Sequence, residues 1–421
     1  MKSTMKKDYL WNTIGVFAQN AISPLLLIAI TRVNGIDGSG LFSFAFSLAI
    51  IFWTLGMWGG RTYQVSDTKS EFSQQSYVMV RVVLSIVMLV GALLFSIVNQ
   101  YDVMKTAIIL ALVLFKVIES ISDAIYGVLQ VHGKLYVVGK SLLYKALFGF
   151  TAFLVVDIWT SSILLGSLAI VAANVLVFVL YDLRLTKKEE HLAIPFSQIT
   201  LYVKRAIAIM KQCAPVFAVA FLIVFSLNIP RYFIDVYAEN EIAYFGILAM
   251  PITLIALVMS FILQPNIVGL AGLYAHKKYQ EFNTIVVRII GITIGIGFAV
   301  FVIAFLIGIP ALQLVFNVDF SDYKDALMVM IAGGIVNAIV SVFINILVVM
   351  RHFKAQFYIL LGTNVALAIA AFVTVQMYGL LGGIYLFTIT NVLQVILLAL
   401  AYSGLLRKKR HTSTSLSSLL E

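Results

Sequence analysis

The chain has 421 residues, of which 62% are hydrophobic and only 11% are charged, and its formal net charge is +10. A soluble protein of this length carries far more charge on its surface, so the composition excludes a soluble globular domain and indicates a polytopic membrane protein. The single cysteine, Cys213, excludes an internal disulfide framework, and the five histidines show no metal-ligand spacing.

Apolar runs long enough to cross a bilayer recur as far as residue 405. The first run follows a basic start at residues 1–8, but it contains Asn12, Gln19 and Asn20 and lacks an obvious cleavage site. We therefore interpret it as a retained span and not as a signal peptide. A glycine-rich turn at residues 32–39 is predicted to follow it. About twelve transmembrane helices are predicted, at 10–31, 40–60, 77–98, 106–130, 140–157, 162–183, 212–230, 243–267, 285–308, 325–350, 357–377 and 381–405.

The basic residues predict the orientation of these spans, because Lys and Arg accumulate on the cytoplasmic side. With the N-terminus inside, 24 of the 29 Lys and Arg residues fall in or beside cytoplasmic segments. Only four fall outside, and Lys116 is left within the membrane. We therefore predict that both termini are cytoplasmic. The net positive charge is then a topology signal and does not indicate nucleic-acid binding, although the basic tail can touch anionic lipid headgroups.

The longest internal connector divides the predicted helices into six and six. It covers residues 184–211 and is basic, and its part at 196–210 mixes apolar and basic residues, as does a helix on the inner membrane surface. We predict an N-terminal lobe at 1–183, this cytoplasmic linker, a C-terminal lobe at 212–405 and a basic tail at 406–421. Two six-helix lobes are a common plan in transporters.

The fourth predicted helix carries an unusual polar face. Lys116, Glu119 and Asp123 are spaced so that an α-helix places them on one side, and ionisable groups in hydrocarbon must pair or face water. Two interpretations stay open. Lys116 and Glu119 can neutralise each other as a helical pair. Alternatively, the face lines a cavity, with Lys116 binding an anionic substrate and Glu119 and Asp123 coupling transport to protons or sodium.

Three arginines near predicted span ends are candidate substrate ligands. Arg32, Arg61 and Arg231 can simply extend to the headgroups. However, Arg61 follows two glycines that permit close helix approach, and Arg231 follows Pro230, which favours a bent helix end. Because the guanidinium fork suits bidentate phosphate binding, several such arginines would form a cationic cavity.

No motif for enzymatic chemistry is present in the sequence. We find no P-loop, zinc-protease motif, nucleophile elbow or haem attachment spacing. The predicted outer loops are short, so there is no room for an external catalytic domain. We therefore expect a protein that is not an enzyme and has no cofactor, with a proton or sodium gradient as its energy source.

Several short motifs resemble the polysaccharide flippases of the Wzx type. The similarity covers the whole twelve-helix plan, and its motifs are Thr31-Arg32-Val33-Asn34-Gly35, Gly40-Leu41-Phe42-Ser43, Gly60-Arg61-Thr62-Tyr63, Asp123-Ala124-Ile125-Tyr126-Gly127-Val128-Leu129-Gln130, Gly139-Lys140-Ser141, Ala214-Pro215-Val216-Phe217 and Asn228-Ile229-Pro230-Arg231-Tyr232-Phe233-Ile234-Asp235.

This resemblance implies a member of the multidrug/oligosaccharidyl-lipid/polysaccharide (MOP) exporter superfamily in a bacterial cytoplasmic membrane. Such proteins have two six-helix lobes around a central cavity and move undecaprenyl-pyrophosphate-linked repeat units by alternating access for capsule, O-antigen or exopolysaccharide synthesis. A cationic cavity holds the anionic head group, and by position Arg32, Arg61 and Arg231 are the equivalents. Lys116 is added for its place in the membrane and matches no motif. The implied partners are the lipid-linked oligosaccharide, membrane lipids, polysaccharide polymerase and chain-length proteins.

Two other functions are compatible with the same spans. A multidrug or cation antiporter of this superfamily would need a cavity dominated by carboxylates, whereas the unpaired charge predicted near the outer side is basic. A polysaccharide polymerase would need a large outer loop with catalytic Arg or His, and none is visible in the sequence.

Overall fold

The computed structural model describes residues 2–67, 71–190 and 192–417, and within these ranges all regular structure is helical. The chain divides into two compact units, Met1–Val224 and Phe225–Glu421. The division falls inside a long helix and not at the linker, so the predicted lobe limits at 183 and 212 stay a prediction.

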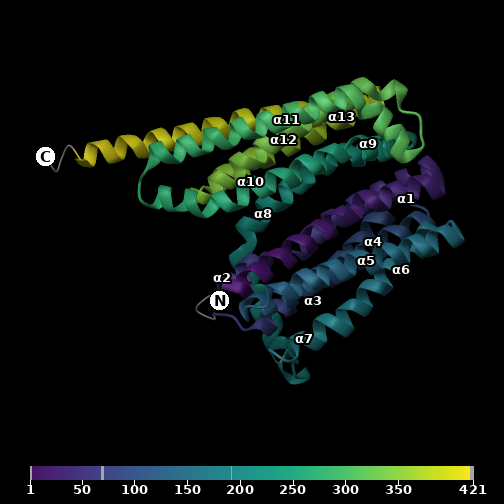
Figure 1. Ribbon diagram of the computed structural model, residues 1–421, viewed down its shortest axis with the longest axis horizontal. Coiled ribbons are helices and arrows are strands. Elements are labelled where there is room, and N and C mark those ends of the chain that lie inside the picture. The colour runs from purple at the N-terminus through teal and green to yellow at the C-terminus, as the bar shows by residue number, and fades with distance from the viewer. Residues whose placement is uncertain (1, 68–70, 191, 418–421) are drawn as a thin grey trace. The chain divides into compact units, whose positions relative to one another are not determined.

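Unit 1 is a bundle built around the helix Val103–Val131 (Figure 1). Its elements are α1 (Lys2–Gly56), α2 (Gly60–Ser66), α3 (Gln74–Val98), α4 (Val103–Val131), α5 (Leu135–Thr160), α6 (Ile163–Val177), the π-helix η1 (Phe178–Leu183), α7 (Arg184–Thr186), the short helix η2 (Phe196–Gln198) and the first part of α8 (Ile199–Tyr237). Helices α1, α3 and α6 all pack on α4, and α5 packs along α1 and α6. Ile109, Leu112 and Val113 of α4 are fully buried, which places the core of this unit along α4.

Unit 2 contains the remaining helices. After the end of α8 they are η3 (Glu239–Glu241), α9 (Ile242–Leu248), α10 (Met250–Ala275), α11 (Tyr279–Phe316), η4 (Ser321–Tyr323), α12 (Lys324–Val349) and α13 (Phe353–Ser417). Helix α12 is the centre of this unit, because α10, α11 and α13 all pack against it.

The longest helix in each unit is broken at a single glycine. Gly35 in α1 has φ 75° and Gly379 in α13 has φ 52°, conformations that residues with a Cβ rarely adopt. The glycine-rich turn predicted at 32–39 is therefore a break at one residue, with helical backbone on both sides.

Helix α8 begins earlier than the sequence pattern indicates. The predicted seventh helix starts at residue 212, whereas α8 starts at Ile199 and runs without interruption to Tyr237. Ala206, Ile209 and Cys213 lie on one face of it and pack in a buried cluster with side chains of α3. This apolar contact explains why the basic segment continues as one helix instead of forming a separate connector.

The helices account for the predicted number of spans. Among the described residues, eight helices are long and apolar enough to cross a membrane, and two of these contain the glycine breaks. Helices α4 and α10, of 29 and 26 residues, also exceed the roughly 20 residues that a crossing requires. The chain is thus an all-α, multi-pass membrane protein with twelve segments of spanning length, as predicted. The orientation of the termini stays a prediction.

Candidate functional site

A sharp turn between α1 and α2 positions the polar centre of unit 1. Helix α1 ends at Gly56, Gly59 is left-handed with φ 81°, and α2 begins at Gly60. The buried side chain of Gln64 then anchors α2, because its amide donates to Gln74 Oε1 at 2.8 Å and to the carbonyl of Ala124 on α4 at 3.0 Å.

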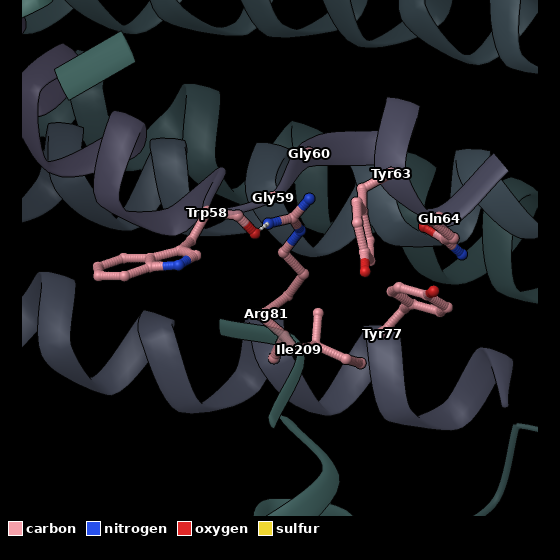
Figure 2. A pocket seen from close by; sticks show the side chains of 9 residues that line it. Trp58, Gly59, Gly60, Tyr63, Gln64, Tyr77, Arg81 and Ile209 are labelled. Carbon is pink, nitrogen blue, oxygen red and sulfur yellow. Dashed lines mark hydrogen bonds between the residues drawn. The ribbon is translucent and has the colours of Figure 1, made fainter. Parts of the chain in front are cut away.

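Arg81 of α3 lies beneath this turn and is only 3% exposed. Its guanidinium donates to the carbonyl oxygen of Gly56 at 2.7 Å and to that of Trp58 at 3.1 Å. Figure 2 shows the guanidinium directed at the turn, with Trp58 on one side and Tyr63 and Tyr77 on the other. Within the described part of the chain, the carbonyls of Gly56 and Trp58 have no helical partner because α1 ends there. They therefore hold the buried guanidinium of Arg81 in place.

Asp123 of α4 completes the arrangement by facing two arginines. Arg61 Nε lies 3.7 Å from Asp123 Oδ1, and Arg81 Nη2 lies 3.4 Å from Asp123 Oδ2. We call these three residues the arginine–aspartate cluster. Two guanidinium groups face one carboxylate, so the cluster carries a net positive charge. In addition, Arg61 Nη1 and Arg81 Nε are buried and lack a hydrogen-bond partner among the described residues.

A small pocket opens beside the cluster. Its cavity volume is only about 10 Å³, roughly the room of one water molecule, and Arg81, Trp58, Gly60, Tyr63 and Gln64 contribute to its lining. Arg81 is the charged side chain of this lining, and the donors of Trp58, Gln64 and Tyr77 are directed at other acceptors. In the part of the chain that the structure describes, no three or more His, Cys, Asp or Glu residues lie together in a way that could hold a metal ion. The excess of guanidinium groups over carboxylates in the adjoining cluster favours an anionic ligand.

Lys116 and Glu119, the other polar residues predicted on α4, pair with each other. Lys116 Nζ lies 2.6 Å from Glu119 Oε2 and within 6 Å of the ring centroids of Phe46, Trp53 and Phe115. Gln19 of α1 donates to the other oxygen of Glu119. This geometry is the helical pair that we considered for the sequence, and the roles of Lys116 in substrate binding and of Glu119 in coupling stay predictions.

A second ion pair lies buried on another face of α4. Lys145 Nζ of α5 lies 2.5 Å from Asp182 Oδ2, and it also donates to Ser122 Oγ at 2.6 Å and to Tyr126 Oη at 2.9 Å. Both charged side chains are at most 2% exposed. Asp182 lies in the π-helix η1, Phe178–Leu183. Single-turn π-helices of this kind often occur at functional sites.

Within unit 1, the predicted ligand Arg32 lies apart from the cluster. Arg32 is exposed and precedes the break at Gly35, and the following helical segment of α1, 21 residues long, separates it from Arg61 by about 30 Å. Arg231 belongs to unit 2, where its guanidinium lies 5.6 Å from the ring centroid of Phe245. Within unit 1, the structure brings Arg61 and Asp123 together and pairs Lys116 with Glu119, and the binding role of Arg231 stays a prediction.

Sequence reasoning missed Arg81, Lys145 and Asp182. Arg81 and Lys145 lie near the starts of the predicted spans 77–98 and 140–157, where the pattern predicts topology determinants, and Asp182 lies at the end of the predicted span 162–183. One usable signal was present. Lys145 lies within a helix that begins at Leu135, more than two turns from its start, where a lone cation in hydrocarbon needs a partner.

Comparison with known proteins agrees with this architecture. No family model matches the chain. Over 395 residues it is 21% identical to a capsular polysaccharide biosynthesis protein, CapF, of Staphylococcus aureus, and the match covers 90% of this chain and 96% of CapF.

Three solved structures are also similar. The first is the inward-facing conformation of a multidrug resistance MATE family transporter of the MOP superfamily, with 15% identity, 96% of both chains covered and a TM-score of 0.70. A MOP superfamily transporter from Pyrococcus furiosus, described as having a binding pocket of reversed polarity, has 13% identity, a TM-score of 0.57, and 97% of this chain and 94% of its own covered. A point mutant of the Vibrio cholerae MATE transporter VcmN has 11% identity and a TM-score of 0.60. The match covers 97% of this chain and 98% of VcmN.

The chain has the MOP superfamily fold. At these identities the similarity establishes the fold alone. The structural neighbours are transporters and not enzymes, in agreement with the expectation that this protein does not catalyse a reaction.

Proposed function

We propose that this protein is a flippase that translocates undecaprenyl-pyrophosphate-linked oligosaccharide repeat units across the bacterial cytoplasmic membrane by alternating access. The fold supports a transport function, and the similarity to CapF supports a substrate from capsule or related polysaccharide synthesis. Polymerase and chain-length proteins are the partners that this role implies.

The arginine–aspartate cluster is the observation that carries this proposal. Arg61 and Arg81 outnumber the single carboxylate of Asp123, and each arginine has a buried nitrogen without a partner among the described residues. A diphosphate offers several anionic oxygens, and guanidinium groups bind such oxygens in pairs. The predicted ligands Arg32, Arg231 and Lys116 remain candidates for other parts of the same substrate.

The second candidate is a multidrug or cation antiporter. It is favoured by the similarity to multidrug resistance MATE transporters. The charge of the cluster favours the flippase, because a site for organic cations needs an excess of carboxylates, and this site has an excess of arginines.

A reconstituted flipping assay tests the proposal. The purified protein is placed in liposomes that contain a fluorescent undecaprenyl-diphosphate oligosaccharide. Flipping should make the label of the inner leaflet accessible from outside. Arg61→Gln should reduce the flipping rate at least tenfold. Arg205→Gln is the matched control, since Arg205 is an exposed arginine of the same unit that stacks on Tyr202. No flipping by the wild type, combined with export of an organic cation, would favour the antiporter.

The energy source is testable in the same liposomes. We propose that a proton or sodium gradient drives transport, with Glu119 and Asp123 as coupling candidates. Imposing each gradient separately should accelerate flipping for one ion only. Equal rates with and without both gradients would contradict a coupled mechanism.

A further inference from the structure

We propose that Asp123 acts as an internal counter-ion which occupies the arginines of the substrate site until the anionic group of the substrate displaces it. This inference rests on the proposed function, because it places the diphosphate of the lipid-linked substrate at Arg61 and Arg81. It adds an exchange reaction in which one carboxylate leaves and one phosphate group enters.

The first support is the looseness of the pairing. Arg81 donates a long hydrogen bond of 3.4 Å to Asp123, and the 3.7 Å contact of Asp123 with Arg61 is beyond hydrogen-bond distance. Two other ion pairs of this unit are much closer, at 2.6 Å for Lys116–Glu119 within α4 and 2.5 Å for Lys145–Asp182 between α5 and η1. Asp123 therefore neutralises charge without making the short contacts that would lock it in place.

The second support is the presence of unused donors. Arg61 Nη1 and Arg81 Nε are buried and have no acceptor among the described residues, and such donors are costly in a protein interior. A carboxylate has two oxygens, and both of them already face the arginines. A phosphate or diphosphate brings more oxygens and can satisfy donors that Asp123 leaves unpaired.

The third support is that Arg81 does not depend on Asp123 for its position. Its hydrogen bonds to the carbonyls of Gly56 and Trp58, at 2.7 Å and 3.1 Å, hold the guanidinium when the carboxylate moves away. The Arg61 side chain is 27% exposed, so a ligand can reach it. One arginine is thus fixed and the other accessible, an arrangement suited to exchanging one anion for another.

Exchange has a functional advantage for a transporter. Substrate binding must be strong enough for loading and weak enough for release on the far side. A carboxylate that competes for the same arginines lowers the affinity for the anionic group and promotes its release. A neutral head group cannot displace Asp123, so the same competition also selects for a charged substrate.

Binding of inorganic diphosphate to the detergent-solubilised, full-length protein tests this inference. By titration calorimetry, Asp123→Asn should lower the Kd for diphosphate at least tenfold relative to the wild type, because the competitor is gone. Arg61→Gln should raise the Kd at least tenfold. Asp157→Asn is the matched control, since Asp157 is a buried carboxylate of the same unit whose partner is Asn34, and its Kd should equal that of the wild type.

The outcomes separate this inference from the proposed function. An unchanged or higher Kd for Asp123→Asn overturns the counter-ion role, while the flippase proposal stands if the wild type still flips substrate. If neither the wild type nor Asp123→Asn binds diphosphate and Arg61→Gln flips at the normal rate, the substrate site itself is wrong. Asp123→Ala provides the same measurement if the asparagine variant fails to fold.

Discussion

Two ionic sites that contact α4 differ in the spacing of their charges, in unused donors and in exposure. In the arginine–aspartate cluster, the charges are 3.4 Å and 3.7 Å apart and buried donors remain unused. In the Lys145–Asp182 pair, the charges are 2.5 Å apart, and all three donors of the ammonium group have acceptors. The first site is partly accessible through Arg61, whereas both members of the second are sealed from solvent.

This difference separates a binding site from a structural one. Removing one partner of a buried, well-paired ion pair leaves an uncompensated charge, so such a pair maintains the arrangement of its helices. Lys145 and Asp182 join α5, α4 and the π-helix η1 in this way. The cluster retains capacity to bind because its own pairing is incomplete.

The largest expected effect comes from the same substitution at both sites. Asp182→Asn leaves Lys145 buried without its counter-ion and should reduce stability by about 3–5 kcal/mol. Asp123→Asn should cost much less, because its contacts are long and Arg81 keeps its two backbone carbonyls. Both variants are compared by heating the detergent-solubilised protein. The apparent melting temperature is the temperature at which half of the monomer peak is lost.

The comparison depends on which of the two variants loses more stability. If Asp123→Asn lowers the apparent melting temperature as much as Asp182→Asn does, the cluster is also a structural pair. Lys145→Met combined with Asp182→Leu provides a control, because an apolar replacement of both partners should recover much of the loss.

The helices could be predicted from the sequence far better than the site. Apolar length is a strong signal, so twelve segments of spanning length and a long central basic region were visible without a structure. The breaks were less visible, because Gly35 and Gly379 look like ordinary loop or helix glycines until their positive φ values are known. The start of α8 at Ile199 was hidden by the basic residues that interrupt its apolar face.

The pairing of charges was the part that the sequence could not supply. The Lys116–Glu119 pair could be foreseen, because its members are three residues apart on one helix. The partners of Asp123 come from α2 and α3, and the partner of Lys145 comes from η1. Such contacts depend on how the helices pack and on which residues face each other across the packed surfaces. A single sequence does not specify either of these.

A smaller effect is expected from moving α2 without changing any charge. A Cβ on Gly127 would lie 2.2 Å from Gln64 Oε1, so Gly127→Ala should force the amide away from Gln74 and Ala124. Loss of these hydrogen bonds and some overpacking should cost about 1–3 kcal/mol.

The expected readout of Gly127→Ala is specific to the cluster. Because α2 carries Arg61, diphosphate binding should weaken several-fold, while Lys145 and Asp182 stay paired. Gly362→Ala, at a helical glycine with no atom near the added methyl, should leave binding unchanged. Normal diphosphate affinity in Gly127→Ala would show that the position of α2 does not control the cluster.

The smallest expected effect concerns pH and the segment that follows α2. Burial is the largest single influence on the pKa of Asp67 and raises it, but hydrogen bonds from the amides of Phe72 and Glu71 and from the Tyr77 hydroxyl together outweigh it and lower the pKa overall. A lowered pKa means that the ionised carboxylate stabilises the folded segment above the unfolded pKa, about 3.9, and that this stabilisation is lost as the pH falls through the folded value.

Amide hydrogen exchange at Glu71 and Phe72, corrected for the intrinsic effect of pH, tests this loss of stabilisation. Protection should be constant above about pH 5, where Asp67 is ionised in both states, and should fall as the solution becomes more acidic. Asp67→Asn should weaken protection and make it independent of pH over the same range. The effect should stay local, because Asp67 lies at the end of α2 and accepts hydrogen bonds from Glu71, Phe72 and Tyr77. Acid could also weaken diphosphate binding, and Asp67→Asn could abolish that loss. Such a result would show that Asp67 controls the arginine–aspartate cluster, so that the adaptable site includes the segment after α2.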